Sequence, residues 1–143
     1  MKILSAFALA VLLTTGRAHA GFVYLDDNLG QLYKGDPTTA TYTYVGTSAT
    51  AAGFGGFTDI DFVGSTLYGL GPDGELYTIN MFSGQIASDV GNTGVRDGSL
   101  VGLAGSPTGV LWAGGNNNSY KINLSTGLAT VVGTGGGGYT HRG

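Results

Sequence analysis

Short runs in which apolar and polar residues alternate recur along the chain, and this alternation predicts β-strands. In the run 75–80, Tyr77 and Ile79 fall on one side of an extended chain, because successive side chains of a strand point to opposite faces. Tyr120 and Ile122 keep the same phase in a later run. A slip of one residue would turn both pairs away from the core, so the shared phase predicts a fixed strand register.

Two tracks of aromatic residues repeat with a period of about 44 residues. The first track comprises Tyr24, Tyr68 and Trp112, and the second comprises Tyr33, Tyr77 and Tyr120. A period of 40 to 50 residues built from short strands is typical of a β-propeller blade. We interpret all six residues as structural anchors that pack one repeat against the next. For the first track, a stripe for sugar stacking is the alternative.

The segments between the runs carry turn residues, which predict hairpins rather than helices. Gly71–Gly74 contains Pro and Asp between two glycines, and Ser83-Gly84 recurs as 125–127 in the next repeat. Further strands are predicted at Phe57–Phe62 and Leu100–Ala104, ahead of the aromatic-bearing strands of repeats two and three. The first repeat lacks room for such a strand. The expected fold is therefore all-β, with four-stranded antiparallel blades of the β-propeller type.

The repeats define the expected domain organisation. Residues 1–20 resemble a signal peptide, with Lys2 before an apolar run and the small-x-small site 18–20. Residues 21–143 are expected to hold β-propeller repeats, with approximate blades at 21–52, 53–95 and 96–136 and a tail at 137–143. Propellers close with typically four to eight blades, so about three blades leave the ring incomplete. A fragment of a longer protein, ring completion by self-association and an open sheet stack remain as explanations.

Charge and cysteine content narrow the possible partners. Without the first twenty residues, four basic and nine acidic residues remain, a formal net charge of −5. There is no basic patch, which argues against nucleic acid as a partner. Cysteine is absent, so disulfides and thiolate metal sites are excluded. No other apolar stretch is long enough to cross a membrane, so no transmembrane segment is expected in the mature chain.

Candidate chemistry is sparse. Asp59 and Asp61 lie on one face of a predicted strand and could line a central channel, as a weak candidate site for a ligand or a metal. Solvated channel or rim residues are the alternative. Asp26 and Asp27 precede Asn28 and are read as turn residues. No set of residues with the pattern of a catalytic site is visible, and no cofactor is expected.

Residues 76–94 and 120–136 resemble repeats of exported bacterial β-propeller proteins, including uncharacterised families of the DUF4394-like kind. The shared pattern runs from Leu-Tyr through an Ile-Asn pair and a Ser/Thr-Gly turn to a final Gly. This resemblance implies a propeller fold and an exported protein, and it implies no functional residue, because the matching positions are packing and turn residues.

These observations lead to a functional expectation. The chain is expected to be a secreted, periplasmic or cell-surface β-propeller repeat protein that is not an enzyme. Its role would be extracellular binding or surface organisation, with an unknown extracellular ligand or a second copy as partner. One alternative is a truncated propeller enzyme acting on a glycan or peptide, with its site in missing blades. The other is a structural repeat protein of the envelope or matrix. Fold alone does not choose among them.

Overall fold

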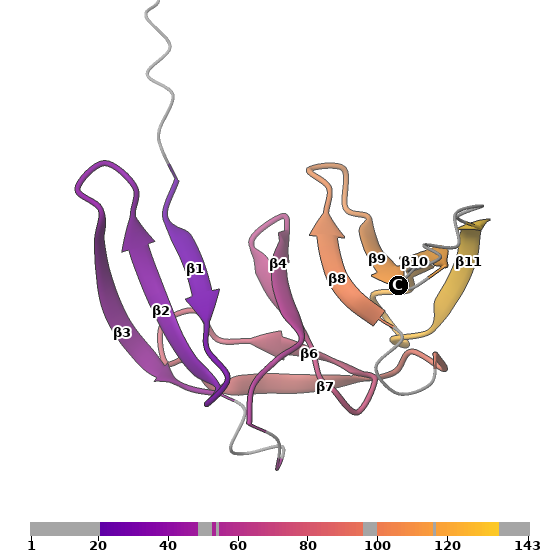
Figure 1. The fold of residues 1–143 in the computed structure, drawn as a ribbon, viewed down its shortest axis with the longest axis horizontal. Coiled ribbons are helices and arrows are strands. Elements are labelled where there is room, and N and C mark those ends of the chain that lie inside the picture. The colour runs from indigo at the N-terminus through magenta and orange to yellow at the C-terminus, as the bar shows by residue number, and fades with distance from the viewer. Residues whose placement is uncertain (1–20, 49–52, 54, 96–99, 116, 135–143) are drawn as a thin grey trace, which may run out of the picture.

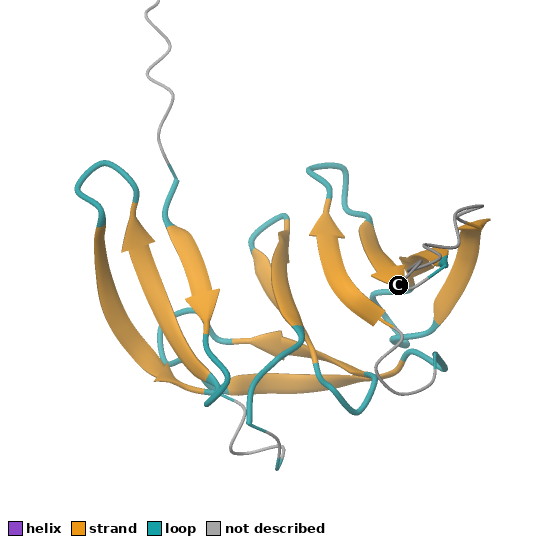
Figure 2. Ribbon diagram, in the orientation of Figure 1, coloured by secondary structure: helices purple, strands orange, loops and turns teal. Residues whose placement is uncertain are grey.

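The computed structural model describes residues 21–48, 53, 55–95, 100–115 and 117–134, and this part of the chain is entirely strands, turns and loops (Figure 2). The expected all-β class is confirmed. The strands form three antiparallel sheets in simple meander order. Sheet 1 contains β1 (Val23–Asp26), β2 (Gln31–Asp36) and β3 (Thr41–Thr47). Sheet 2 contains β4 (Asp59–Val63), β5 (Thr66–Leu70), β6 (Glu75–Ile79) and β7 (Ile86–Asn92). Sheet 3 contains β8 (Leu100–Gly105), β9 (Leu111–Gly115), β10 (Asn118–Ile122) and β11 (Ala129–Thr134).

The strand count follows the sequence pattern closely. Among the described residues, sheets 2 and 3 have four strands and sheet 1 has three, which agrees with the expectation that the first repeat lacks the extra strand. β4 begins at Asp59, two residues after the start of the predicted strand at Phe57. The backbone amide of Phe57 instead donates to the Asp26 carboxylate, 3.1 Å away, so the segment that leads into β4 is linked to sheet 1. The predicted signal peptide and tail lie outside the described residues.

A bulge recurs at the same place in all three sheets. The ladder shifts between Leu32 and Tyr33, between Leu76 and Tyr77, and between Ser119 and Tyr120. In each case one valine of the last strand is left without a partner across the ladder; these residues are Val45, Val90 and Val132. A bulge bends its strand and increases the local twist. The repeat in the sequence is therefore a repeat of sheet curvature as well as of packing.

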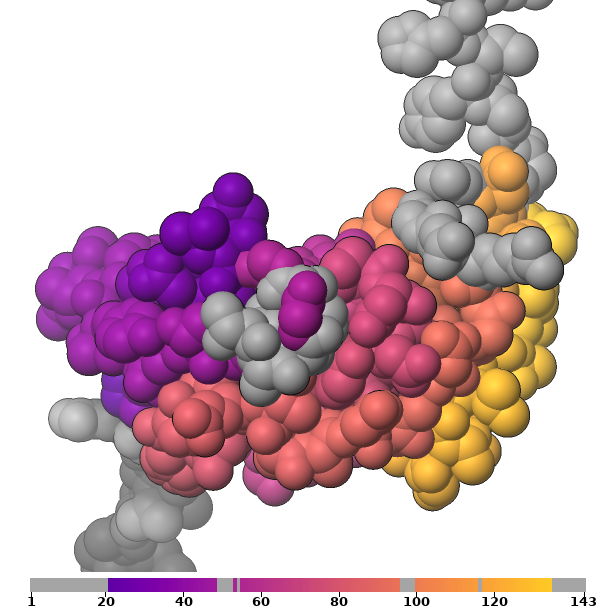
Figure 3. Space-filling model, turned by 90° about the horizontal axis from the view of Figure 1, so that it is seen from below, coloured from indigo at the N-terminus to yellow at the C-terminus, as the bar shows by residue number. Residues whose placement is uncertain are grey.

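The sheets stand side by side, with sheet 2 between the other two (Figures 1 and 3). One face of sheet 2 places Leu67, Tyr77 and Ile79 in a core with Leu32 of sheet 1. The opposite face places its own residues in a second core with sheet 3. From sheet 2 these buried residues are Val63, Tyr68, Leu70 and Leu76, and from sheet 3 they include Leu111, Tyr120 and Ile122. Successive side chains of β5 and β6 therefore enter different cores, one on each face of sheet 2. A shift of one residue would disturb both cores, which explains why the repeats keep the same alternation.

Glycines let the edges of neighbouring sheets touch through their backbones. A Cβ on Gly84, in the β6–β7 turn, would lie 2.7 Å from the Cα of Gly46 on β3. A Cβ on Gly127, in the β10–β11 turn, would lie 2.5 Å from the carbonyl carbon of Gly91 on β7. Gly84 and Gly127 also have φ values of 72° and 75°, which favour glycine. The same backbone contact therefore occurs at both junctions between sheets.

Candidate functional site

The carboxylates of Asp59 and Asp61 connect sheet 2 to sheet 3. Asp59 Oδ2 accepts a hydrogen bond of 2.7 Å from the amide of Leu103, and Asp61 Oδ2 accepts one of 2.6 Å from the amide of Gly105. The other oxygen of each carboxylate accepts from the next residue of β4, over 2.9 Å and 2.7 Å respectively. β4 and β8 are not paired in a ladder, so these side chains supply acceptors that a neighbouring strand would otherwise supply.

This geometry bears directly on the sequence-based ligand or metal role for the two aspartates. Each carboxylate already accepts hydrogen bonds through both oxygens, and hydrogen bonds to an ionised acceptor are the stronger kind. Among the described residues, no group of three or more His, Cys, Asp or Glu side chains could hold a metal ion. The arrangement suits a structural connection between two sheets that are not joined by a ladder.

Asp26 makes a similar connection between sheets 1 and 2, which the sequence analysis did not foresee. Its Oδ2 accepts from the Phe57 amide, whereas Asp27 accepts from Leu29 and Gln31 within the turn, as expected for a turn residue. Burial raises the pKa of Asp26, against the lowering effect of the Phe57 hydrogen bond; the charges of Asp59 and Asp27 raise it further. The signal in the sequence was a carboxylate at the end of β1, which looked like part of the turn.

The first aromatic track faces the following sheet at Tyr24 and Tyr68. Tyr24 meets Phe62 of sheet 2 edge-on, with ring centroids 5.5 Å apart, and Tyr68 is buried against sheet 3 with 8% of its surface exposed. Trp112, on sheet 3, is 40% exposed.

The second track faces the preceding sheet. Tyr77 packs on Phe57 at 6.0 Å, and its hydroxyl donates to Asp73 over 3.0 Å; burial and this hydrogen bond raise the pKa of Tyr77. Tyr120 is buried in the core that sheet 3 shares with sheet 2, and Tyr33, on sheet 1, packs edge-on against Tyr44 at 5.8 Å. The second track therefore joins sheets at Tyr77 and Tyr120, while Tyr33 contacts its own sheet.

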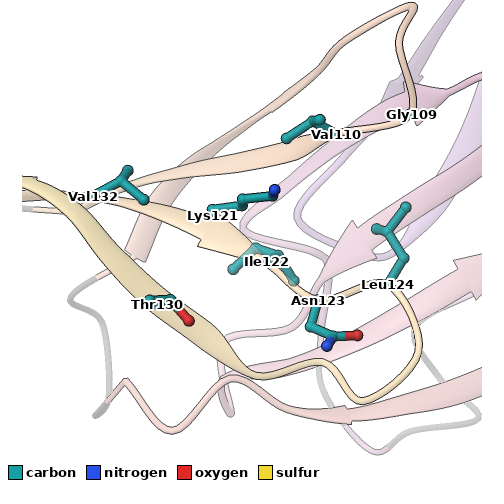
Figure 4. Close-up of a pocket in the computed structure, with 8 residues that line it drawn as sticks. All are labelled: Gly109, Val110, Lys121, Ile122, Asn123, Leu124, Thr130 and Val132. Atoms are coloured by element: carbon teal, nitrogen blue, oxygen red, sulfur yellow. The ribbon is translucent and has the colours of Figure 1, made fainter.

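Two grooves occupy equivalent places at the same end of sheets 2 and 3. The sheet 3 groove has a volume of about 460 Å³ and is shown in Figure 4. It is lined by Gly109, Val110, Lys121, Ile122, Asn123, Leu124, Thr130 and Val132. The sheet 2 groove has a volume of about 290 Å³. It is lined by Ser65, Thr66, Leu67, Thr78, Ile79, Asn80, Met81, Phe82 and Ala87. Six lining positions coincide when the repeats are superimposed by strand register, from Ser65 and Gly109 to Met81 and Leu124.

Each groove lies between two hairpin turns and combines an apolar base with polar edges. Ile79 and Ile122 occupy the same position, as do Asn80 and Asn123, whose side-chain oxygens accept amide hydrogen bonds within their turns. The sheet 2 groove adds Phe82, which is 85% exposed at its edge. Such a surface offers hydrogen bonds and an apolar contact to a ligand, and the sheet 3 groove adds the amine of Lys121.

These grooves are absent from the sequence-based predictions, although part of their signal is visible in the sequence. The Ile-Asn pair recurs at 79–80 and 122–123 and was read only as part of the repeat. The other wall comes from the β4–β5 and β8–β9 turns, about fourteen residues earlier in each repeat, and only the sheet pairing places it beside the Ile-Asn pair.

Comparison with known proteins identifies the fold and no family. Neither a protein-family model nor a curated protein matches the chain. A solved structure from work on the de novo evolutionary emergence of a symmetrical protein has a TM-score of 0.55 at 23% identity, over 80% of this chain and 55% of that one. The computationally designed protein Ika8 has a TM-score of 0.50 at 13% identity, over 76% of this chain and 32% of that one. The chain thus spans little more than half of the first structure and about a third of the second. At such low sequence identities, the likeness shows a similar fold alone.

Within the described residues, no helix has the length and apolar character needed to cross a membrane.

Proposed function

We propose that this chain is a β-propeller repeat protein of the exported bacterial kind and that it binds an extracellular ligand without catalysis. The observation that carries the binding role is the recurrence of one groove at equivalent positions in two sheets. A ligand made of repeated units would contact both grooves, and two linked contacts bind more tightly than one.

The propeller assignment is supported by the way the sheets follow one another. Each sheet is an antiparallel meander, and the first strands of sheets 2 and 3, β4 and β8, lie side by side and are joined by carboxylates. A packed series of such sheets is how propellers are built. Export is supported by the signal-like residues 1–20.

A non-catalytic role is supported by the use that the structure makes of its acidic side chains. Asp59 and Asp61 accept backbone hydrogen bonds from sheet 3, and Asp26 accepts one from Phe57 in the segment that leads into β4. A carboxylate used in this way holds the sheets together, and its oxygens already accept from donors of the protein.

The binding role is tested by titrating the isotopically labelled full chain with neutral and acidic oligosaccharides and with short peptides, followed by amide NMR shifts. The expected result is a paired response, in which Asn80 and Met81 shift together with Asn123 and Leu124. Phe82→Ser should weaken the response at the sheet 2 groove. Leu29→Ser, which alters another exposed apolar turn residue away from both grooves, should leave it unchanged. No shift at either groove with any of these probes would favour the structural envelope role instead.

A further inference from the structure

Within the described residues, sheets 1 and 3 each have one face that no other sheet covers, and these two faces differ in character. The sheet 1 outer face consists of Val23, Leu25, Tyr33, Tyr42 and Tyr44, and Tyr42 is 62% exposed. The sheet 3 outer face consists of Trp112, Ser119, Lys121, Thr130 and Val132, in which Trp112, Lys121 and Thr130 face one another across the strands. Sheet 2, by contrast, is covered on both faces.

The sheet 3 outer face carries residues that cover the next sheet elsewhere in this molecule. Trp112 occupies the position of Tyr24 and Tyr68, both of which contact the following sheet. Val132 is the bulged valine, equivalent to Val45 and Val90, and both of those pack in the cores between sheets.

The sheet 1 outer face is the matching half of that interface. Tyr33 occupies the position of Tyr77 and Tyr120, which pack on the preceding sheet. Tyr42 stands where sheets 2 and 3 have Ile86 and Ala129, both packed at a junction between sheets. Sheet 1 therefore presents the face that a preceding sheet would cover, and sheet 3 presents the face that a following sheet would cover.

From this match we propose that a second copy of the chain packs head to tail, with its sheet 1 outer face on the sheet 3 outer face of the first. Such a contact joins two different patches, and repeated by both copies it closes a ring. The proposal rests on the propeller assignment above: the three described sheets of one copy and the three of a second give six blades, within the usual four to eight.

The side chains at the two faces complement each other in size and charge. The sheet 3 outer face has Ser119 where sheets 1 and 2 have the fully buried Leu32 and Leu76, which leaves room for a larger partner. The tyrosines of the sheet 1 outer face supply the larger side chains. Lys121 can lie against one of their rings, as the equivalent Lys34 does over Phe22, with its Nζ 3.6 Å from the ring centre.

The proposed contact between copies differs in one respect from the contacts between sheets 1 and 2 and between sheets 2 and 3. Ala40, with φ of 52°, occupies the turn position that Gly84 and Gly127 occupy in sheets 2 and 3. Its Cβ would prevent the close backbone approach made by those glycines to Gly46 and Gly91. The two copies must stand farther apart at that edge, where Tyr42 is larger than Ile86 and Ala129.

The contact between copies affects the two grooves differently. Lys121, Thr130 and Val132 belong both to the sheet 3 outer face and to the lining of the sheet 3 groove, so a second copy covers part of that groove. The sheet 2 groove is open although sheet 3 already packs on sheet 2, and pairing leaves it open.

The test is the mass of the full chain in solution, measured by light scattering and sedimentation across a concentration series. A particle of two chains is expected. Trp112→Glu on sheet 3 and Tyr42→Glu on sheet 1 should each raise the dissociation constant at least about 30-fold, since a charge replaces a central aromatic contact. Phe82→Glu, at an exposed turn away from both faces, should leave it unchanged.

Mixing the two variants distinguishes the head-to-tail contact from a symmetric one. A Trp112→Glu chain keeps its sheet 1 outer face and a Tyr42→Glu chain keeps its sheet 3 outer face, so the mixture should regain a pair held by one intact contact. A monomer at all concentrations overturns the proposal, and so does a Trp112→Glu dimer as stable as the unaltered one. These outcomes are read without any ligand, so they are independent of groove binding.

Discussion

Asp59 and Asp61 join two sheets that share no ladder, so each should contribute more to the stability of the fold than an ordinary surface carboxylate. Asp61 accepts from the amides of Gly105 and Phe62, and only the first of these joins different sheets. Asp61→Ala leaves the Gly105 amide without its acceptor in a half-buried place. The free energy of unfolding should therefore fall by about 1–3 kcal/mol, measured by urea denaturation.

Asp89→Ala is the matched control for this substitution. Asp89 is an exposed carboxylate of the same sheet, on β7, and its removal should change stability by about 0.5 kcal/mol or less. Equal losses in the two variants would mean that the connection from Asp61 to sheet 3 contributes little.

Asp26 gives a pH dependence of opposite sign to that of an ordinary stabilising carboxylate. Burial holds its folded-state pKa above the usual 3.8, so the folded chain binds this proton more tightly than the unfolded chain does. The contribution of Asp26 to stability therefore falls as pH rises from the unfolded to the folded pKa, and the penalty is complete above the folded pKa. Asp26→Asn keeps an oxygen acceptor for the Phe57 amide, so it should be at least as stable as the unaltered chain at neutral pH.

The advantage of Asp26→Asn should shrink as pH falls through the folded pKa toward 3.8, as followed by thermal unfolding at a series of pH values. Asp36 offers the reverse case, because hydrogen bonds from Thr38 lower its pKa. Asp36→Asn should lose relative stability above the unfolded pKa, and the difference should vanish as pH falls through the folded pKa. Parallel pH profiles for Asp26→Asn and the unaltered chain would show that the Asp26 proton is bound equally in both states.

At the scale of the elements, the turn glycines decide how closely the sheets approach. Gly84→Ala adds a Cβ that meets the backbone of Gly46 and also disfavours the φ of 72°. Gly109→Ala has a similar φ of 84°, but its Cβ would enter open space. Gly109→Ala should therefore cost only the backbone term of about 1–2 kcal/mol, and Gly84→Ala should cost clearly more.

Equilibrium unfolding of the two glycine variants separates the backbone term from the contact between sheets. Equal midpoints in urea would show that the β6–β7 turn can withdraw from β3 without loss.

The sequence predicted elements better than contacts, and the reason is physical. Alternation and turn residues report on neighbours along the chain, so the strands of sheets 2 and 3 and the short first sheet could be read directly. The roles of Asp59 and Asp61 depend on amides 44 residues away, and no local pattern shows such a partner. The equal spacing of the two carboxylates and their partners does match the repeat period, which is a sign of repeat contacts that could be sought in similar chains.

At the scale of the whole molecule, sheet 2 should be the last of the three sheets to unfold. Its strands β5 and β6 contribute side chains to both cores, whereas sheets 1 and 3 each share only one. In repeat architectures, stability is approximately a sum of repeat and interface terms, so an end repeat opens more readily than a central one. Amide hydrogen exchange should therefore be slowest in β5 and β6 and faster in β3 and β11.

If two copies pair head to tail, the amide exchange rates of sheets 1 and 3 should also depend on protein concentration. Pairing covers the outer faces of sheets 1 and 3 and leaves sheet 2 as it is, so exchange in β1, β2, β9 and β10 should slow as concentration rises. β5 and β6 should slow less, because their contacts are complete within one copy. Trp112→Glu should remove the concentration dependence and keep the order among the sheets. Protection that is independent of concentration in the unaltered chain would mean that the outer faces stay open, and the order among the sheets would then reflect one copy alone.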